Sequence, residues 1–445
     1  MNTDLTVGHA GKVLFIFTIP MFISVIFQQM YNMADSIIAG KFAGENALAA
    51  VGASYPITMI FMAIAMGCNI GCSVVISQLF GAKRIREMKT AISTTLISAT
   101  ILSLLLTLLG LLFCNSLMRM IQTPSNIFSD SALYLRIYIL GLIFVFLYNV
   151  TTGIFTSLGD SKTPLYFLIA SSMGNIFLDY IFVRYFSMGV LGVAWATFIA
   201  QGAACVFSLF TLIRRIRAME SGADSSLFSW SMLKTISTIA IPSILQQSFV
   251  SVGNIFVQGL VNSYGSSVIA GYSAAIKLNT FTLTSFGTLG NAMSNFTAQN
   301  IGAKKIERVQ KGYRADTAMA LFLAALFFLA YFIFPKQCMS LFLNAESKKA
   351  MDTGITFLRI LSPFYFIICL KLATDGILRG AGALNAFMIA TFSDLFLRIG
   401  FAYLFSYSMQ SSVGIWLSWP FGWIIGTAIS LGFYFKGSWK KASIT

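Results

Sequence analysis

The 445-residue sequence has few charges, one histidine and no cysteine pattern typical of a metal site. Only 10% of its residues are charged, against about a quarter in an ordinary soluble domain, so a water-soluble fold would lack polar surface. His9 is the single histidine, and the six cysteines show no zinc-type spacing. Without a nucleophile–base pair or a metal cluster, the sequence argues against an enzyme.

Apolar segments fill most of the chain instead. Hydrophobic residues make up 57% of it, 42 residues are Phe, and runs of about 20 apolar residues recur from end to end. The first run continues past Pro20 without a small-residue cleavage site, so we interpret it as a helix and not as a signal peptide. The pattern predicts an all-α integral membrane protein with about twelve transmembrane helices, near 13–39, 47–77, 90–113, 132–157, 163–183, 189–213, 235–262, 267–298, 315–335, 353–378, 386–407 and 412–435.

The positive charges are distributed unevenly between the two sides of these helices. The net charge is +15, but the charges lie between apolar runs and form no basic face on a soluble domain, which argues against nucleic acid as a partner. Of the 30 Lys and Arg, 19 fall in the termini and alternate loops and six on the opposite side. By the positive-inside rule, both termini are expected to be cytoplasmic.

The second half of the chain repeats the first. The segment from Asp35 to Gly40 matches Asn254 to Gly259 after 219 residues, and Gln-Leu-Phe-Gly-Ala-Lys at 78–83 returns as Gln-Asn-Ile-Gly-Ala-Lys at 299–304. A period this long indicates a duplicated bundle and not a solenoid. We therefore predict an N-lobe over residues 1–216, a cytoplasmic linker over 217–234 and a C-lobe over 235–445, as two six-helix bundles related by pseudo-twofold symmetry.

Two acids of the first half lie within predicted helices. Asp35 and Asp179 would each cost several kcal/mol in the membrane unless paired, protonated or bound to a cation. Asn175 is one turn before Asp179 on the same helical face, and Thr197 follows on the next helix. Together these oxygen-bearing side chains predict a cation site that suits Na⁺; the two carboxylates could equally share a proton. The alternative for Asp35 is a hydrated position near the outer end of its helix.

The second half carries a different set of charges. Asp394 and Arg398 occupy the repeat positions of Asn175 and Asp179, and their i,i+4 spacing favours an internal salt bridge. Lys371, Asp375 and Arg379 share one helical face and are expected to form a structural network. The predicted cation site is therefore not duplicated.

A substrate site is harder to locate from the sequence. Lys277 lies far from either end of its helix and is expected to need a carboxylate or carbonyl partner. Flexible thioethers can accommodate varied lipophilic cations, although such residues more often belong to a core. The candidates for a substrate cleft are Met33, Gln246, Gln247, Asn254 and Lys277.

The order and spacing of several short motifs resemble the multidrug and toxic compound extrusion family, in particular its bacterial branch with acids in the N-lobe. They are Ile19-Pro20, Tyr31-Asn-Met-Ala-Asp35, Ala49-Ala-Val-Gly52, Gln78-x2-Gly-Ala82, Asn175-x3-Asp179 and Ala196-Thr197. The resemblance covers nearly the whole chain. It implies an exporter of organic cations and hydrophobic drugs, driven by inward Na⁺ or H⁺, with its N-lobe cation site at Asp35, Asn175, Asp179 and Thr197. Where some relatives carry acids in the seventh and tenth helices, this chain has Gln246, Gln247, Asn254 and Lys371, which argues against a second cation site.

The sequence is compatible with two functions. The first is an antiporter of the bacterial cytoplasmic membrane, expected to act as a monomer, without a cofactor beyond its coupling ion. The second is a flippase for lipid-linked precursors of the same superfamily, for which Lys277, Lys371 and Arg398 would bind pyrophosphate.

Overall fold

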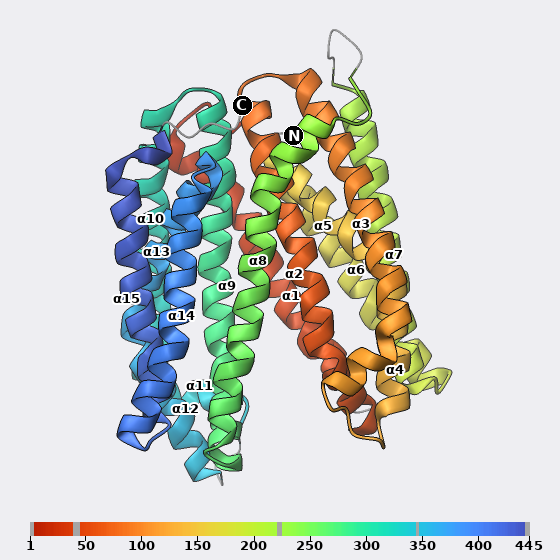
Figure 1. Cartoon of the computed structure of the whole chain (residues 1–445), viewed down its shortest axis with the longest axis vertical. Coiled ribbons are helices and arrows are strands. Elements are labelled where there is room, and N and C mark those ends of the chain that lie inside the picture. Colours follow the sequence, from red (N-terminus) through yellow and green to blue (C-terminus); the bar gives the residue numbers. More distant parts are fainter. Residues whose placement is uncertain (1–3, 39–44, 220–224, 344–346, 441–445) are drawn as a thin grey trace. The chain divides into compact units, whose positions relative to one another are not determined.

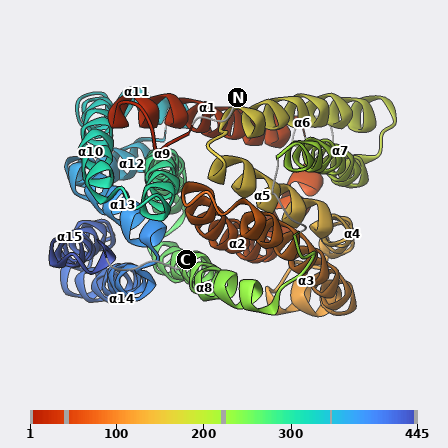
Figure 2. The ribbon, with the colours of Figure 1, turned by 90° about the horizontal axis from the view of Figure 1, so that it is seen from above.

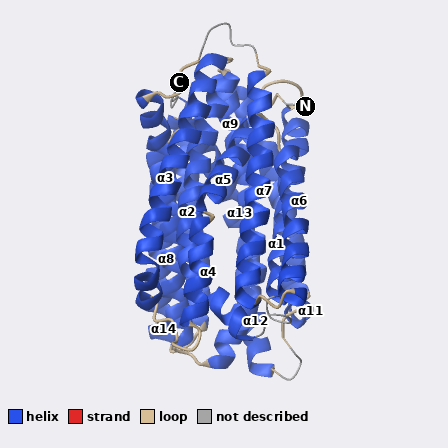
Figure 3. Ribbon diagram, turned by 90° about the vertical axis from the view of Figure 1, so that its right-hand side faces the viewer, coloured by secondary structure: helices blue, strands red, loops and turns tan. Residues whose placement is uncertain are grey.

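The structure, a computed structural model, describes residues 4–38, 45–219, 225–343 and 347–440, without the side chains at 35, 36 and 45–48. All regular elements in this part of the chain are helices (Figures 1 and 3). Those of the first half are α1 (Ala10–Ile38), α2 (Glu45–Gly81), α3 (Ile85–Met120), α4 (Phe128–Leu140), α5 (Leu142–Ser157), α6 (Lys162–Tyr180) and α7 (Gly189–Arg217). Those of the second half are α8 (Trp230–Asn262), α9 (Ser266–Gly302), α10 (Ile306–Phe328), α11 (Pro335–Ser340), α12 (Lys348–Leu361), α13 (Tyr365–Ala381), α14 (Leu384–Met409) and α15 (Val413–Lys436).

Most of these helices are long and apolar enough to cross a membrane. Ten spans qualify among the described residues, and the pair α4 and α5, bent by 49° at Gly141, adds an eleventh. The 37-residue α9 is also long enough but is rich in Ser, Thr and Asn. The prediction of an all-helical membrane protein with about twelve spans is confirmed.

The chain divides into two compact units. One consists of Met1–Asp4 and Ile19–Gln247, and the other of Leu5–Thr18 and Ser248–Thr445. The first third of α1 and the last half of α8 thus belong to the second unit, and the remainder of each helix to the first. Pro20 in α1 and Pro242 in α8 lie near these division points, where each removes one helical hydrogen bond.

Both units use the same packing scheme. In the first, α5 contacts α2, α3 and α7, and α6 lies beside α7. In the second, α13 contacts α9, α10 and α15, and α14 lies beside α15 (Figures 1 and 2). The sequence repeat is therefore also a repeat of helix contacts.

Glycines bring α9 and α13 into backbone contact. A methyl group on Gly376 would collide with the carbonyl of Gly290, and one on Gly380 with the carbonyl of Ser294. Gly376 and Gly380 form a Gly-x-x-x-Gly pair, a spacing that lets membrane helices approach closely. These two helices consequently pack in direct backbone contact inside the second unit.

A buried acid fixes the start of α6. Asp160 accepts hydrogen bonds from the backbone of Lys162 and Thr163 and from the Thr163 hydroxyl, and it pairs with Arg215 at the end of α7 at 2.5 Å. Burial alone would raise the pKa of Asp160, but the hydrogen bonds from Thr163 and Arg215 outweigh it and hold this pKa below its usual value. A lowered pKa means that the stabilisation is complete at neutral pH and is lost as the pH falls through the folded-state pKa.

Asp160→Ala is therefore expected to lower the free energy of unfolding by about 2 kcal/mol, the scale of hydrogen bonds to a charged group. The measurement is thermal unfolding of the purified protein at neutral and acidic pH, and the difference from wild type should shrink in acid. Glu87→Ala, which breaks the exposed pair with Arg84, is the control and should change stability by less than about 0.5 kcal/mol. Equal effects of the two variants would contradict the assignment.

Candidate functional site

Three of the four predicted cation-site residues meet in the first unit. Asn175 and Asp179 lie one turn apart near the end of α6, and both are buried. Directly after them the helix widens into a π-helical turn, Ile181–Tyr185. Thr197 on the neighbouring α7 faces Asn175, with 3.4 Å between its hydroxyl oxygen and the Asn175 amide.

The Asn175 amide joins three helices. In the orientation that satisfies both ends of the amide, its nitrogen lies 3.0 Å from an Asp179 carboxylate oxygen and 3.2 Å from the Tyr31 hydroxyl, and its oxygen accepts a hydrogen bond from the Thr197 backbone N–H at 3.1 Å. The Thr197 hydroxyl donates to the Val193 carbonyl at 3.0 Å. Asp179 is thus a buried acceptor in a cluster of polar side chains.

The fourth predicted residue, Asp35, belongs to α1, but its side chain lies outside the described residues. Tyr31, one turn earlier on the same helix, does reach the cluster. Sequence reasoning missed Tyr31 as a site residue because a tyrosine in an apolar helix is an ordinary membrane residue. The useful signal was its i,i+4 spacing to Asp35, which places both on one helical face.

The donor set suits a proton or a hard monovalent cation. The described residues contain no group of three or more His, Cys, Asp or Glu that could hold a metal ion. Carboxylate, amide, hydroxyl and phenol oxygens are ligands of hard cations. In the present orientation the amide nitrogen faces Asp179, so the amide must turn before its oxygen can ligate a cation beside that carboxylate.

Tyr31→Phe tests the place of the phenol in this cluster. Removing a hydroxyl 3.2 Å from the amide should raise the half-saturating concentration of the coupling ion severalfold, because the amide loses a partner worth about 1 kcal/mol. Transport measured against ion concentration should show this shift while the maximal rate stays within about twofold. Tyr166→Phe, at an exposed position on α6, is the matched control, and an unchanged half-saturation in Tyr31→Phe would remove Tyr31 from the site.

The corresponding region of the second unit is an ion-pair cluster. Lys371 on α13 pairs with Asp375 at 2.7 Å and lies 3.8 Å from Asp394 on α14. The Ser430 hydroxyl of α15 donates to the other Asp375 oxygen at 2.6 Å. The glycine at position 426 of α15 leaves space for the cluster. A methyl group there would lie only 2.8 Å from both Asp394 Cβ and Lys371 Cε.

The salt bridge predicted between Asp394 and Arg398 is wrong. The Arg398 guanidinium lies over the Trp419 ring, 4.4 Å from its centroid, and Asp394 approaches Lys371 from another helix. The predicted network on α13 is confirmed for Lys371 and Asp375. Arg379 instead donates to Asn291 at 2.6 Å and to Ser294 at 3.4 Å, both on α9.

The predicted substrate residues are divided between the two units, with Met33, Gln246 and Gln247 in the first and Asn254 and Lys277 in the second. Met33 is 57% exposed, Asn254 and Lys277 are exposed, and the Gln246 side-chain oxygen is buried without a hydrogen-bond partner among the described residues. Gln247 contacts the Met66 sulfur at 3.7 Å. Among the described residues, Lys277 forms no ion pair or hydrogen bond with the expected carboxylate or carbonyl, and its ammonium lies 5.8 Å from the Phe342 ring centroid.

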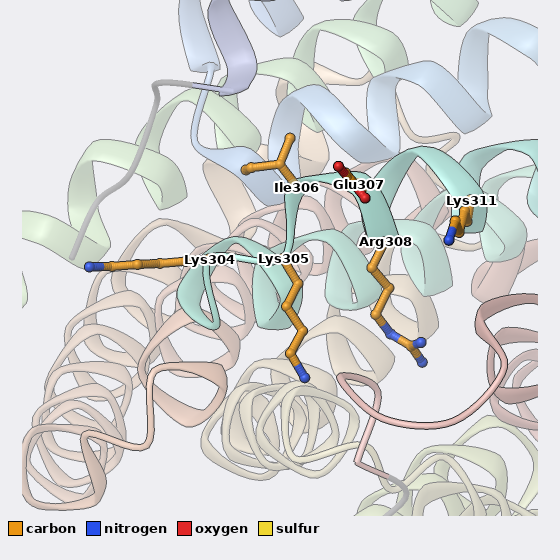
Figure 4. A pocket seen from close by; sticks show the side chains of 6 residues that line it. All are labelled: Lys304, Lys305, Ile306, Glu307, Arg308 and Lys311. Carbon is orange, nitrogen blue, oxygen red and sulfur yellow. The ribbon is translucent and has the colours of Figure 1, made fainter.

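A basic pocket at the start of α10 is built for the chain's own N-terminal segment. Figure 4 shows its lining residues, Lys304, Lys305, Ile306, Glu307, Arg308 and Lys311. Lys305 donates to the Thr6 carbonyl at 2.7 Å, and Arg308 donates to the carbonyls of Val7 at 2.6 Å and Leu5 at 3.1 Å. These bonds anchor residues 5–8, so we interpret the pocket as structural.

Comparison with known proteins agrees with this architecture. The family model MatE matches residues 20–181 and again residues 242–404. The probable multidrug resistance proteins YpnP and YoeA of Bacillus subtilis are 28% and 26% identical to the chain and cover 99% and 97% of it, over 98% and 94% of their own lengths.

Solved structures share the fold at low sequence identity. A MOP superfamily transporter from Pyrococcus furiosus, described as having a binding pocket of reversed polarity, superimposes with a TM-score of 0.92 at 24% identity, covering 99% of each chain. A multidrug resistance MATE family transporter in an outward-facing conformation gives the same score, identity and coverage. With two copies of the family domain filling most of its length, this multi-pass membrane protein is a transporter and not an enzyme, and it belongs to the MatE family.

Proposed function

We propose that this protein exports lipophilic or cationic small molecules across the bacterial cytoplasmic membrane, as a monomer with both termini in the cytoplasm, in exchange for inward H⁺ or Na⁺. The observation that carries the proposal is the buried cluster of Asn175, Asp179, Thr197 and Tyr31 in the first unit. Intramembrane acids commonly mark ion pathways. The names of the relatives YpnP, YoeA and MepA, a multidrug export protein of Staphylococcus aureus, support the substrate class.

The coupling follows from the cluster's position on α1, α6 and α7. Proton or Na⁺ binding at Asp179, together with Asp35, neutralises the carboxylate and turns the Asn175 amide. Tyr31, which contacts that amide, carries the change into α1. Ion and drug drive each other's transport because they favour different conformations of the two units, which is the requirement for alternating access.

Two of the three basic residues that a flippase would use to bind pyrophosphate are buried. Lys371 is 2% exposed and paired with Asp375, and Arg398 is 7% exposed and covered by Trp419. Neither is available to a pyrophosphate group in this conformation. Only Lys277 of the three is exposed, which is weak support for a polyanionic substrate.

The test is ethidium efflux from proteoliposomes under a proton gradient alone and a sodium gradient alone. We expect efflux under one gradient and none without either, and the effective gradient identifies the coupling ion. Liposomes with protein denatured before reconstitution give the background. Background efflux under both gradients would overturn the drug-export proposal, and transport of a lipid-linked pyrophosphate by the same liposomes would establish the flippase.

A further inference from the structure

The second unit contains a buried acid that lies outside the ion-pair cluster. Asp316 on α10 is fully buried, and neither of its carboxylate oxygens has a hydrogen-bond partner among the described residues. It lies ten residues after Ile306, the start of α10, which is about 15 Å along the helix. An ionised carboxylate in such a place would cost several kcal/mol.

The surroundings of Asp316 are apolar or neutral. The other buried residues of its helical stripe are Val309, Gly312, Ala320 and Ala324. Gly312 packs against the Phe296 ring of α9. The stripe itself therefore offers Asp316 no side-chain oxygen and no charge of the opposite sign.

The titratable groups nearest to Asp316 do not neutralise a negative charge. Tyr313 on α10 and Cys369 on α13 both interact with it electrostatically, and the Tyr313 hydroxyl is 2.7 Å from the Thr374 hydroxyl. Asp316 forms no ion pair within the described part of the chain. The elements packed against α10 carry further charged and titratable residues: Tyr272 and Lys277 of α9, Tyr365, Cys369, Lys371, Asp375 and Arg379 of α13, Tyr331 of the π-helical turn Leu329–Ile333, and His9 and Lys12 around the start of α1, where Gly11 approaches Ala315. The Tyr434 ring of α15 lies 4.7 Å from that of Tyr313, centroid to centroid.

The repeat supplies an internal comparison for this position. The buried stripe of α3 lies 221 residues earlier and reads Met88, Ala91, Thr95, Ala99 and Ser103, so Thr95 corresponds to Asp316. The Thr95 hydroxyl donates to the Ala91 carbonyl of its own helix at 2.7 Å. A protonated carboxyl group has an O–H to donate in the same way, whereas a carboxylate has none. Both repeats thus place a small oxygen-bearing side chain at this buried position, and only the one in the second unit is titratable.

We propose that Asp316 is a proton-binding site of the second unit, occupied by a proton in the conformation described here and separate from the cation site at Asp179. A conformation that opens the contact of α10 with α9 and α13 to water would release the proton. The second unit then exchanges a proton of its own, whichever ion binds in the first.

Infrared difference spectroscopy of the purified protein at neutral pH tests this proposal. Subtracting the spectrum of Asp316→Asn from that of wild type should leave the C=O stretching band of one protonated carboxyl group, which shifts in D₂O. Asp316→Thr introduces the residue found at the corresponding position of the first unit and should remove the same band. It replaces the Asn variant in the test if that variant folds poorly. Asp130→Asn, at an exposed acid that starts α4, should not change this region of the spectrum.

Two outcomes separate this site from the proposed coupling site. The band should persist in Asp179→Asn, and its presence does not depend on which drug or ion is transported, so drug export can fail while the proton site stands. A carboxylate band in place of the protonated one, in both difference spectra, would overturn the proposal.

Discussion

Asp179→Asn is expected to reduce gradient-driven ethidium efflux to the background of protein-free liposomes. The amide has nearly the same shape as the carboxyl group and can still bond to Asn175, 3.0 Å away, but it binds neither a proton nor Na⁺. Without a change of charge at this buried position, the ion no longer favours one conformation over the other, and the coupling free energy disappears. Efflux initial rates under the effective gradient provide the measurement.

Two controls make the loss specific. Asp130→Asn makes the same substitution at an exposed position on α4 and should transport like wild type. Thermal unfolding of Asp179→Asn should stay close to that of wild type, because the amide keeps the shape of the side chain and can still bond to Asn175. Efflux near the wild-type rate in Asp179→Asn would remove this residue from the coupling mechanism.

Lys371→Met is expected to destabilise the second unit by about 3–5 kcal/mol, enough to lower the yield of folded protein severely. Methionine fills a similar volume, but the change leaves Asp375 and Asp394 without the ammonium group that lies 2.7 and 3.8 Å from them. Yield and thermal unfolding in detergent are the measurements. Lys277→Met, at an exposed position on α9, is the matched control and should alter stability by less than about 0.5 kcal/mol.

A second substitution distinguishes charge from shape in this cluster. Lys371→Met combined with Asp375→Asn removes one charge of each sign, and we expect it to recover much of the lost stability. Ser430 can continue to donate to the remaining side-chain oxygen of residue 375, as it does at 2.6 Å in the present structure. If the double variant is less stable than Lys371→Met, packing and not electrostatics explains the effect.

Hydrophobicity was sufficient to predict the helices and their duplication, but not their interruptions. The 49° bend between α4 and α5 at Gly141 and the 3₁₀ turn Ser362–Phe364 before α13 lie inside continuous apolar runs. Hydropathy averaged over a window does not detect such local changes in the direction of a helix. The N-lobe cluster was predictable because i,i+4 spacing on one helix is a local property, as Asn175 and Asp179 show.

Contacts between helices account for the errors. Asp394 and Arg398 have the spacing of an ion pair, yet Lys371 from α13 and the Trp419 ring of α15 offer each of them a different partner. The sequence pattern does not single out Asp316, because the ninth predicted helix begins at 315, next to the basic residues Lys311 and Arg314. In the structure α10 begins at Ile306, which puts Asp316 well inside it.

The division of α1 and α8 between the two units bears on the ancestry of the chain. Trp230–Gln247 of α8 packs in the first unit, where Ala240 and Ile244 cover Gly71 and Gly67 of α2, and Leu5–Thr18 packs in the second. Each six-helix repeat thus completes its interior with the opening segment of the other copy. A single-copy ancestor built on this plan would have been a homodimer that exchanged its first helical segments. Gene fusion would then have converted an exchange between two molecules into one within a single chain.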